Sequence, residues 1–183
     1  TIEQAVGFPC FVKANRAGSS FGISKVYKAE ELPLAIENAF KEDHQVLIEA
    51  ALVGREISVG VLKWKKEIKV LPITEIISEN DFFDYEAKYE GKSKEITPAQ
   101  LPEAWTEAVV TLSKKIYQKM GLEGVTRSEF IFENGIPHLL EVNTIPGMTL
   151  QSLIPQQLEV DGISLLEFLE ELIAEALRKK EYL

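Results

Sequence analysis

The sequence is poor in the residues that build disulfide frameworks and zinc sites. It contains one cysteine, Cys10, and two histidines, His44 and His138. A single cysteine excludes an internal disulfide and any zinc site that needs several cysteine ligands, and two histidines are too few for a histidine-rich metal site. No apolar run approaches the 18 or so residues that a membrane-spanning helix needs, so we expect no membrane partner.

Positive charge is also in short supply. The 183 residues include 20 Lys and Arg against 29 Asp and Glu, which gives a net charge of −9. This balance argues against nucleic acid as a partner, because nucleic-acid binding depends largely on basic side chains that contact phosphates. With 45% apolar and 27% charged residues, the composition is that of an ordinary globular protein. The available chemistry therefore comes from carboxylates, backbone amides, lysine and arginine.

Strand patterns and amphipathic helix patterns follow one another along the chain, which predicts a mixed α and β fold with strands paired mainly as hairpins. The expected strands cover residues 8–13, 22–27, 45–50, 56–62, 67–76, 125–132 and 136–143. The expected helices cover residues 29–41 and 102–120, and a last helix begins at about residue 164. A break at residues 50–54 is the best internal boundary, and it separates a small first lobe from a larger second one.

Two loops are candidates for function. Residues 15–22 (NRAGSSFG) follow Lys13, and such a loop can offer backbone N–H groups and hydroxyls to phosphate oxygens. The loop does not have the Walker pattern, and a flexible hairpin tip is the alternative interpretation. Residues 81–97 lack a clear period, and long loops of this kind are usually functional or disordered.

The segment 125–143 predicts an acidic hairpin. Arg127 and Glu129 share one face of the first strand, and Glu141 and Asn143 share one face of the second. We predict a three-residue loop at 133–135 with a left-handed glycine and a bulge, which brings these four residues to one surface. A two-residue turn would instead place the two glutamates on opposite sides.

Two carboxylates and an amide oxygen beside an arginine suit Mg²⁺ together with phosphate. A solvated strand face of alternating charge is the alternative. The break at residues 143–148 (NTIPGM), directly after the second strand, is of a kind that exposes backbone N–H groups.

Five runs of residues carry a more specific signal. They are VKANRAGSSFGISKV (12–26), VLIEAALVGREISVGVL (46–62), FDYEAKY (83–89), GVTRSEFIF (124–132) and LLEVNTIPGMTLQSLIP (140–155). In this order they resemble D-alanine–D-alanine ligases of the ATP-grasp superfamily. The resemblance implies an α+β ATP-grasp fold, in which two lobes with antiparallel sheets clamp ATP. Residues 1–52 would be a truncated central lobe, and residues 53–183 a C-terminal lobe with a lid loop at about 78–98.

The resemblance also implies an activity. The family joins two D-alanines to D-alanyl-D-alanine through an acyl phosphate, for peptidoglycan precursor synthesis in the cytoplasm. The reaction uses ATP and two Mg²⁺ ions, with Mn²⁺ as an alternative metal, and the full-length enzyme can form a homodimer. The family's N-terminal domain has no counterpart in this sequence, so we expect a fragment that is inactive alone.

The family pattern assigns roles to individual residues of this chain. The residues that would contact the nucleotide are Lys13, Ser19, Glu49, Leu52, Glu56 and Lys88. Those that would act at the reacting centre or on the lid are Ser20, Tyr89, Arg127 and Gly147. Those that would bind the two Mg²⁺ ions are Glu129, Glu141 and Asn143, and Ser152 would hold the carboxylate of the second substrate.

Two positions deserve comparison with the family pattern. Glu129 stands where the family usually has Asp, and Tyr89 favours the dipeptide product over D-alanyl-D-lactate. Two other functions compete with this interpretation. One is another ATP-grasp ligase that joins a carboxylate to an amine or a thiol, and the other is a non-catalytic domain that binds a nucleotide with magnesium.

Overall fold

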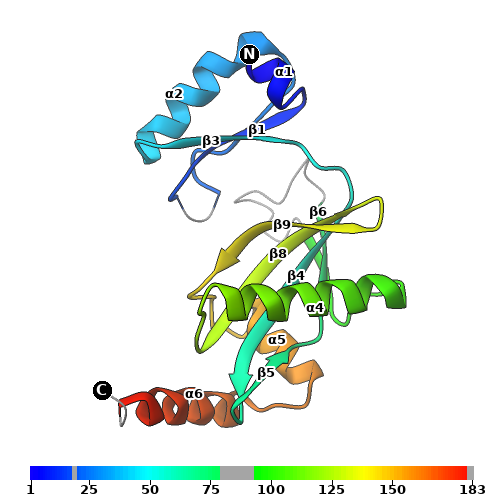
Figure 1. The fold of residues 1–183 in the computed structure, drawn as a ribbon, viewed down its shortest axis with the longest axis vertical. Coiled ribbons are helices and arrows are strands. Elements are labelled where there is room, and N and C mark those ends of the chain that lie inside the picture. Colours follow the sequence, from blue (N-terminus) through cyan, green and yellow to red (C-terminus); the bar gives the residue numbers. More distant parts are fainter. Residues whose placement is uncertain (18–19, 79–92, 181–183) are drawn as a thin grey trace. The chain divides into compact units, whose positions relative to one another are not determined.

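The computed structural model describes residues 1–17, 20–78 and 93–180, which form two compact units (Figure 1). The first unit is Thr1–Val53, and the second contains Gly54–Ile77 and the chain from Lys94 onward. Each unit has its own sheet, and the strands whose register is known pair antiparallel. The predicted α+β class is therefore confirmed.

The first unit is a three-stranded sheet covered on one face by a helix. It contains α1 (Ile2–Ala5), β1 (Cys10–Ala14), β2 (Ser24–Val26), η1 (Ala29–Glu31), α2 (Leu32–Glu42) and β3 (Val46–Ala50). The strand order is β2-β1-β3. Cys10 and Val12 on β1 are buried with Ala35 and Ala39 of α2, while Phe11 and Lys13 alternate to the other face.

The second unit is a six-stranded sheet with three helices. Its strands are β4 (Arg55–Trp64), β5 (Glu67–Val70), β6 (Thr74–Ser78), β7 (Ser93–Ile96), β8 (Val125–Glu133) and β9 (Ile136–Asn143). Its helices are α4 (Glu103–Lys119), α5 (Leu153–Val160) and α6 (Leu165–Lys180). The strand order is β7-β6-β4-β8-β9, and β5 pairs with the end of β4.

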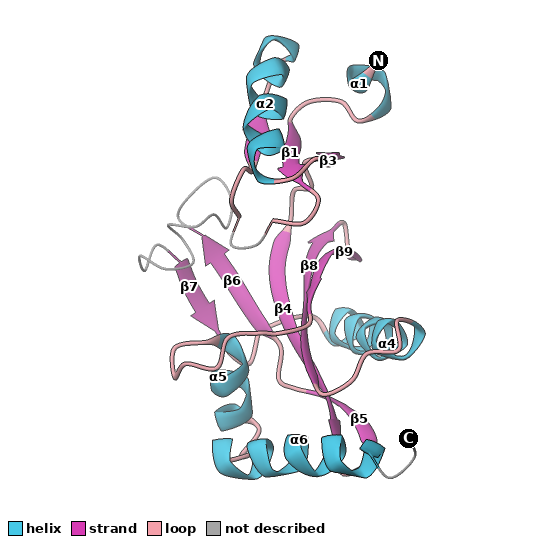
Figure 2. Ribbon diagram, turned by 90° about the vertical axis from the view of Figure 1, so that its left-hand side faces the viewer, coloured by secondary structure: helices cyan, strands magenta, loops and turns pink. Residues whose placement is uncertain are grey.

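The two faces of this second sheet have different neighbours. Figure 2 shows α4 on one side of the sheet, α5 on the other, and α6 across its lower end. The α4 side holds the larger core, whose buried members include Ile57, Val59, Val61, Val109, Tyr117, Phe130 and Phe132. The α5 side holds a second core only near α5 and α6, with Leu62, Leu71, Val125, Ile154, Leu158 and Phe168. The rest of that face carries polar residues such as Ser58 and Glu129 together with Ile76 and Ile131.

Four elements differ from the sequence-based prediction, and the first is the short helix α1, which was not predicted. The segment 67–76 was expected as one strand, but it forms β5 and the start of β6, separated at residues 71–73. Residues 93–96 were expected in a loop, but they form β7, which lies beside β6 at the edge of the sheet. The sequence predicted no helix at α5, which is short and has Pro155 in its first turn, where proline is tolerated. Residues 79–92 of the expected lid lie outside the described residues.

We expect Gly54→Ala to lower the free energy of unfolding by about 2–3 kcal/mol, because a Cβ at this position would overlap the backbone carbonyl oxygen of Phe132. Gly162→Ala is the matched control. A Cβ there meets nothing within 4 Å, and only the positive φ of 75° opposes it, at a cost of about 1 kcal/mol. Urea denaturation of both variants measures the difference, and equal losses would contradict the predicted overlap.

Candidate functional site

The β8–β9 hairpin has a tighter turn than the sequence predicted. Glu133 pairs with Ile136, so the turn consists of two residues, Asn134 and Gly135, with φ angles of 52° and 81°. Two consecutive left-handed residues are the signature of a type I′ turn, which Asn-Gly favours. The prediction of a three-residue loop at 133–135 is therefore wrong.

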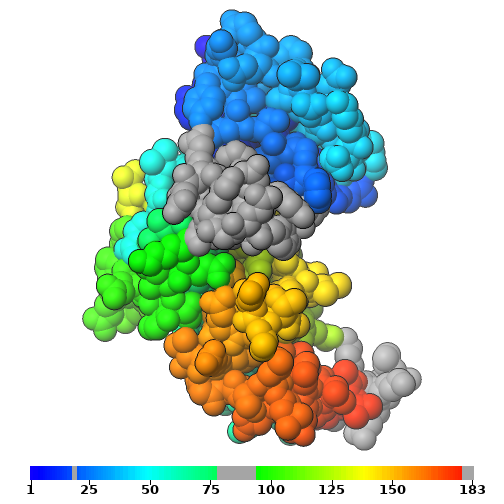
Figure 3. All heavy atoms as spheres, turned by 180° about the vertical axis from the view of Figure 1, so that it is seen from behind, coloured from blue at the N-terminus to red at the C-terminus, as the bar shows by residue number. Residues whose placement is uncertain are grey.

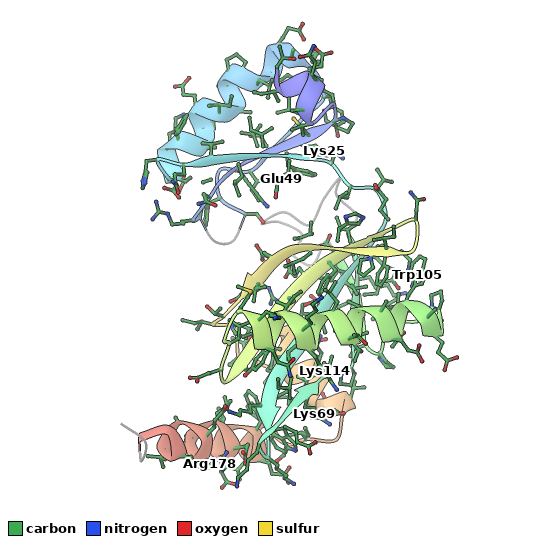
Figure 4. The ribbon with its side chains drawn as sticks, viewed as in Figure 1. Lys25, Glu49, Lys69, Trp105, Lys114 and Arg178 are labelled. Carbon is green, nitrogen blue, oxygen red and sulfur yellow. The ribbon has the colours of Figure 1, made fainter. Side chains whose placement is uncertain are left out.

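Packing on α4 accompanies this tight turn. The Trp105 ring stacks on Phe132 with a centroid distance of 4.7 Å and an interplanar angle of 12°. A Cβ on Gly135 would lie 3.1 Å from Nε1 of Trp105, so the turn passes close to the indole. Figure 4 shows Trp105 near the end of α4, beside the hairpin turn. The glycine thus meets both the backbone requirement of the turn and the limited space beside the indole.

A β-bulge in β9 sets the faces of the acidic residues. Phe130 pairs with Leu139, but Glu129 pairs with Glu141, so β9 contains one extra residue, Leu140, between the two pairs. Beyond the bulge, Arg127 pairs with Asn143. Directly opposed residues of an antiparallel pair point to the same side of the sheet. The predicted convergence of Arg127, Glu129, Glu141 and Asn143 on one face is found, although the extra residue lies in the strand and not in the turn.

The centre of this face is a nearly buried ion pair. Arg127 Nη2 donates to Glu129 Oε1 at 2.8 Å, and the two side chains are 15% and 4% exposed. Removing one partner of an ion pair with so little solvent around it is far more destabilising than removing one partner of a surface pair. Glu141 on the neighbouring strand is exposed, so the acidic face runs from a buried carboxylate to an accessible one.

Two buried polar atoms on this face have no hydrogen-bond partner among the described residues. They are Oγ of Ser58 and Nε of Arg127. Ser58 lies on β4 directly opposite Glu129 and is fully buried. Buried donors without a partner are costly to a folded protein and are usually explained by water or a ligand. The carboxylates, the guanidinium and these free donors together fit a phosphate bound with a divalent cation.

The loop after β9 brings two further predicted residues together. A Cβ on Gly147 would lie 2.8 Å from Ser152 Oγ, so these residues are neighbours. Ser152 Oγ accepts a hydrogen bond from Thr149 N–H at 3.2 Å and lies 2.9 Å from Thr149 Oγ1. Ser152 is also the N-cap residue of α5. Figure 3 shows this loop, coloured yellow to orange, beside α5 at the molecular surface.

Asn143 closes the other end of this loop. Its Oδ1 accepts a hydrogen bond from Ile145 N–H at 3.0 Å, which forms a local turn directly after β9. The chain therefore leaves the strand at a fixed angle. The side-chain oxygen of Asn143, which was predicted as a metal ligand, has this backbone contact in the structure.

The first unit places two predicted residues on the open face of its sheet. Lys13 Nζ lies 2.5 Å from Glu49 Oε2, with side chains 22% and 47% exposed. The two residues are diagonal neighbours on adjacent strands, because Lys13 pairs with Leu47 and Phe11 pairs with Glu49. The family pattern assigned both Lys13 and Glu49 to contacts with the nucleotide, and the structure joins them in an ion pair.

A second lysine extends the charged part of this face. Lys25 Nζ lies 5.8 Å from the centroid of Phe11 and 5.4 Å from that of Tyr27. Figure 4 labels Lys25 and Glu49 on this sheet. The open face therefore combines two lysines with aromatic rings.

The remaining predicted residues are less fully described. Ser20 has a φ of 61°, an uncommon backbone conformation for a residue other than glycine. Leu52 is half-buried after β3. Glu56 is half-buried on β4, opposite Ile131. Ser19, Lys88 and Tyr89 lie outside the described residues.

The structure adds polar residues that the sequence analysis did not single out, namely Ser58 and Gln157 beside the acidic face and a half-buried ion pair on the opposite side of the sheet. In that pair, Arg55 donates to both carboxylate oxygens of Glu75, at 2.6 and 2.7 Å, and to the carbonyl of Gln100 at 2.8 Å. The hydrogen bonds to Glu75 raise the pKa of Arg55. The alternation of side chains along a strand could have predicted that Ser58 shares a face with Glu56. No local sequence signal identifies the hydrogen-bond partners of Gln157.

Neither a metal cluster of three acidic, histidine or cysteine side chains nor a membrane-spanning helix occurs in the described parts of the chain. Magnesium sites typically use few protein carboxylates, because phosphate and water oxygens complete the coordination.

Comparison with known proteins gives a consistent result. Residues 1–174 match the family described as D-ala D-ala ligase C-terminus. The D-alanine–D-alanine ligase of Flavobacterium johnsoniae is 60% identical over 164 residues, which cover 90% of this chain and 51% of that protein. The corresponding ligase of Christiangramia forsetii is 51% identical, with 98% of this chain and 55% of that protein covered. The chain thus spans about half the length of the curated relatives it matches.

Solved structures agree with the sequence comparison. The D-alanine–D-alanine ligase of Bacillus anthracis complexed with ATP has a TM-score of 0.82 and 31% identity, with 98% of this chain and 56% of that chain covered. The VanG D-Ala:D-Ser ligase of Enterococcus faecalis also has a TM-score of 0.82, with 35% identity and coverages of 94% and 51%.

We expect Arg127→Met to lower the free energy of unfolding by about 3 kcal/mol, because it leaves the buried Glu129 carboxylate without its partner. Adding Glu129→Gln to this variant should recover at least about 1 kcal/mol, since the unpaired charge is then gone. Adding Glu107→Gln, on exposed helix surface, should recover nothing. Chemical denaturation of the set, together with the single variant Glu129→Gln, gives the coupling energy, and a value near zero would mean that the pair does not stabilise the fold.

Proposed function

Because the chain belongs to the D-alanine–D-alanine ligase family, we propose that it forms the ATP- and magnesium-binding part of an enzyme that joins two D-alanines. Its α+β architecture is the ATP-grasp fold of this family. The observation that carries the proposal is the single face on which Glu129 pairs with Glu141 and Arg127 pairs with Asn143. An ATP-driven ligation needs cation ligands and a fixed positive charge in this combination.

The proposed reaction has two steps. A carboxylate oxygen of the first D-alanine attacks the γ-phosphorus of ATP, the bond to ADP breaks, and an acyl phosphate forms. The amine of the second D-alanine then attacks the carbonyl carbon, loses a proton, and the tetrahedral intermediate expels phosphate to leave the peptide bond. Both steps place negative charge on oxygen atoms, which a protein stabilises with positioned cations and N–H donors.

The residues of the second unit suit these needs. Glu129, Glu141 and Asn143 would hold the two magnesium ions, or Mn²⁺ in their place, and the metal supplies charge neutralisation to the phosphates when bound. Arg127 is held against Glu129 at 2.8 Å, and its Nε, which has no hydrogen-bond partner among the described residues, is the proposed donor to a developing oxyanion. The Gly147 N–H is the second proposed donor to that oxyanion, and the neighbouring Ser152 is proposed to bind the carboxylate of the second D-alanine.

We assign the nucleotide contacts to residues of both proposed lobes, 1–52 and 53–183. The proposed nucleotide-binding residues are Lys13, Ser19, Glu49, Leu52, Glu56 and Lys88, and Ser20 and Tyr89 would act near the reacting groups. The Lys13–Glu49 ion pair and the positive φ of Ser20 support this for the described residues. We place the full-length enzyme in the cytoplasm, where it can form a homodimer, and we expect the 183 residues alone not to complete the reaction.

One structural likeness favours a second candidate function. The solved D-Ala:D-Ser ligase matches this chain as well as the ATP-complexed D-alanine–D-alanine ligase does, with a TM-score of 0.82 in both cases. A ligase that joins D-alanine to D-serine would use the same metal and phosphate residues. ADP release with D-alanine alone, compared with an equimolar mixture of D-alanine and D-serine, separates the two candidates when the products are identified by mass.

We expect Glu129→Gln and Glu141→Gln each to weaken binding of magnesium–ATP to this chain by about tenfold or more, because each removes one anionic metal ligand. Glu107→Gln, the matched control on the exposed side of α4, should bind within twofold of the unchanged chain. Isothermal titration calorimetry in the presence of Mg²⁺ measures these affinities. Unaltered binding by both site variants would refute the assignment of these carboxylates.

We expect Arg127→Lys to lower kcat of the enzyme of full family length by about a hundredfold, because lysine cannot reproduce the planar donor set of arginine. The Michaelis constant for ATP should change much less. Arg178→Lys on α6 is the control and should keep normal turnover. The assay is D-alanine-dependent ADP release, and unchanged turnover in Arg127→Lys would rule out the proposed oxyanion contact.

A further inference from the structure

The strand β4 has a gap in its pairing, where the Leu71 N–H donates to the Gly60 carbonyl at 2.9 Å and a side chain satisfies the Gly60 N–H and the Ser58 carbonyl. On the edge away from β8, β4 pairs with β6 over residues 56–58 and with β5 over residues 61–64. The amide of Gln157, from α5, lies at this gap. Its Oε1 accepts from Gly60 N–H at 3.1 Å, and its Nε2 donates to the Ser58 carbonyl at 3.1 Å and to Thr74 Oγ1 at 3.0 Å.

The bonding pattern fixes the orientation of this amide. Gly60 N–H can only donate and the Ser58 carbonyl can only accept, so the oxygen and nitrogen of Gln157 cannot exchange places. Gln157 is fully buried, and both hydrogens of its NH₂ group and its oxygen are used. A buried amide that satisfies all these groups is costly to replace.

Close packing around Gly60 holds the helix against the strand. A Cβ on Gly60 would overlap Oε1 of Gln157 and lie 2.8 Å from Ile154 Cδ1 and 2.9 Å from Leu71 Cδ1. The side chains of Gln157 and Ile154 on α5 therefore pack against β4 in space that any residue larger than glycine at position 60 would fill. The two β4 residues that Gln157 contacts are also those opposite the ion pair, because Ser58 pairs with Glu129 and Gly60 pairs with Arg127.

The same helix begins at the residue proposed to bind the second substrate. Ser152 is the N-cap of α5, five residues before Gln157, and it contacts Gly147 and Thr149 in the preceding loop. A shift of α5 along or away from β4 would therefore move Ser152 and this loop relative to Arg127 and Glu129. Displacements of about 1 Å in such arrangements cost up to about a hundredfold in rate.

We infer that Gln157 is a positioning residue that sets the distance between the amino-acid carboxylate site at the start of α5 and the ion pair of β8. It touches neither substrate in this inference and acts through the backbone of β4 and the helix. The expected effect of Gln157 on substrate binding rests on the proposed function. Its role in holding α5 against β4 does not.

The first test measures positioning in the 183-residue chain by hydrogen exchange. In Gln157→Met, which is similar in length but lacks the hydrogen bonds, the amides of Thr149, Ser152 and Leu153 should exchange at least tenfold faster. Amides in the middle of α4 should be unchanged, as should all sites in the control Gln118→Met on the exposed surface of α4. Equal acceleration throughout the second unit, or none at the start of α5, would overturn the inference.

The second test measures the consequence in the enzyme of full family length. Gln157→Met should raise the Michaelis constant for the second D-alanine by about tenfold and that for ATP by less than twofold. Thr74→Val removes one of the three Gln157 hydrogen bonds together with the hydrogen bond between Thr74 Oγ1 and Thr97 Oγ1, and it serves if Gln157→Met does not fold. It should raise the same constant by about threefold. Values within twofold of the unchanged enzyme in every folded variant would overturn the inference. If the enzyme without substitutions shows no D-alanine-dependent turnover, only the proposed function is contradicted. The hydrogen-exchange test still shows whether Gln157 positions the start of α5.

Discussion

One extra residue in β9, Leu140, determines which side of the sheet each later residue of this strand faces. Toward the turn, Phe130 and Phe132 of β8 must face α4, because they complete the larger core. Beyond the bulge, Glu129 and Arg127 stand opposite Glu141 and Asn143. A one-residue change of register in a strand moves every later side chain to the other face. The bulge therefore lets one hairpin serve a hydrophobic core at its turn and an acidic face at its open end.

The acidic face in turn relies on the strand between the two layers of helices. The residues of β4 alternate between the α4 core, which takes Ile57 and Val59, and the site face, which carries Ser58 and Gly60. Because Arg127 and Glu129 are nearly buried, their charges depend on each other and on this rigid support. Fixed charges of this kind need little rearrangement when a ligand develops charge, which is the property that favours catalysis by preorganised groups.

Much of this arrangement could be predicted from the sequence, but for partly different reasons. Alternation correctly placed Arg127 with Glu129 and Glu141 with Asn143, and the family pattern identified the same residues. The prediction of a three-residue turn was wrong because Asn134 and Gly135 favour a two-residue turn, which packs beside Trp105. The bulge was not predicted in β9 because a bulge can lie anywhere in a strand without a local sequence signal. Gln157 was missed because its partners lie up to 99 residues away in the sequence. Contacts at such separation depend on the assembled sheet, which no local pattern encodes.

The stacking of Trp105 on Phe132 also gives the protein an intrinsic optical reporter. The sequence has only two tryptophans, and this one lies against the turn of the hairpin that carries the acidic face. Indole emission depends on the groups in contact with the ring, so a change in the hairpin alters the fluorescence of the chain without any added label. With Trp64 replaced by phenylalanine, the remaining signal would come from a single known place, the indole stacked on Phe132, three residues along β8 from Glu129.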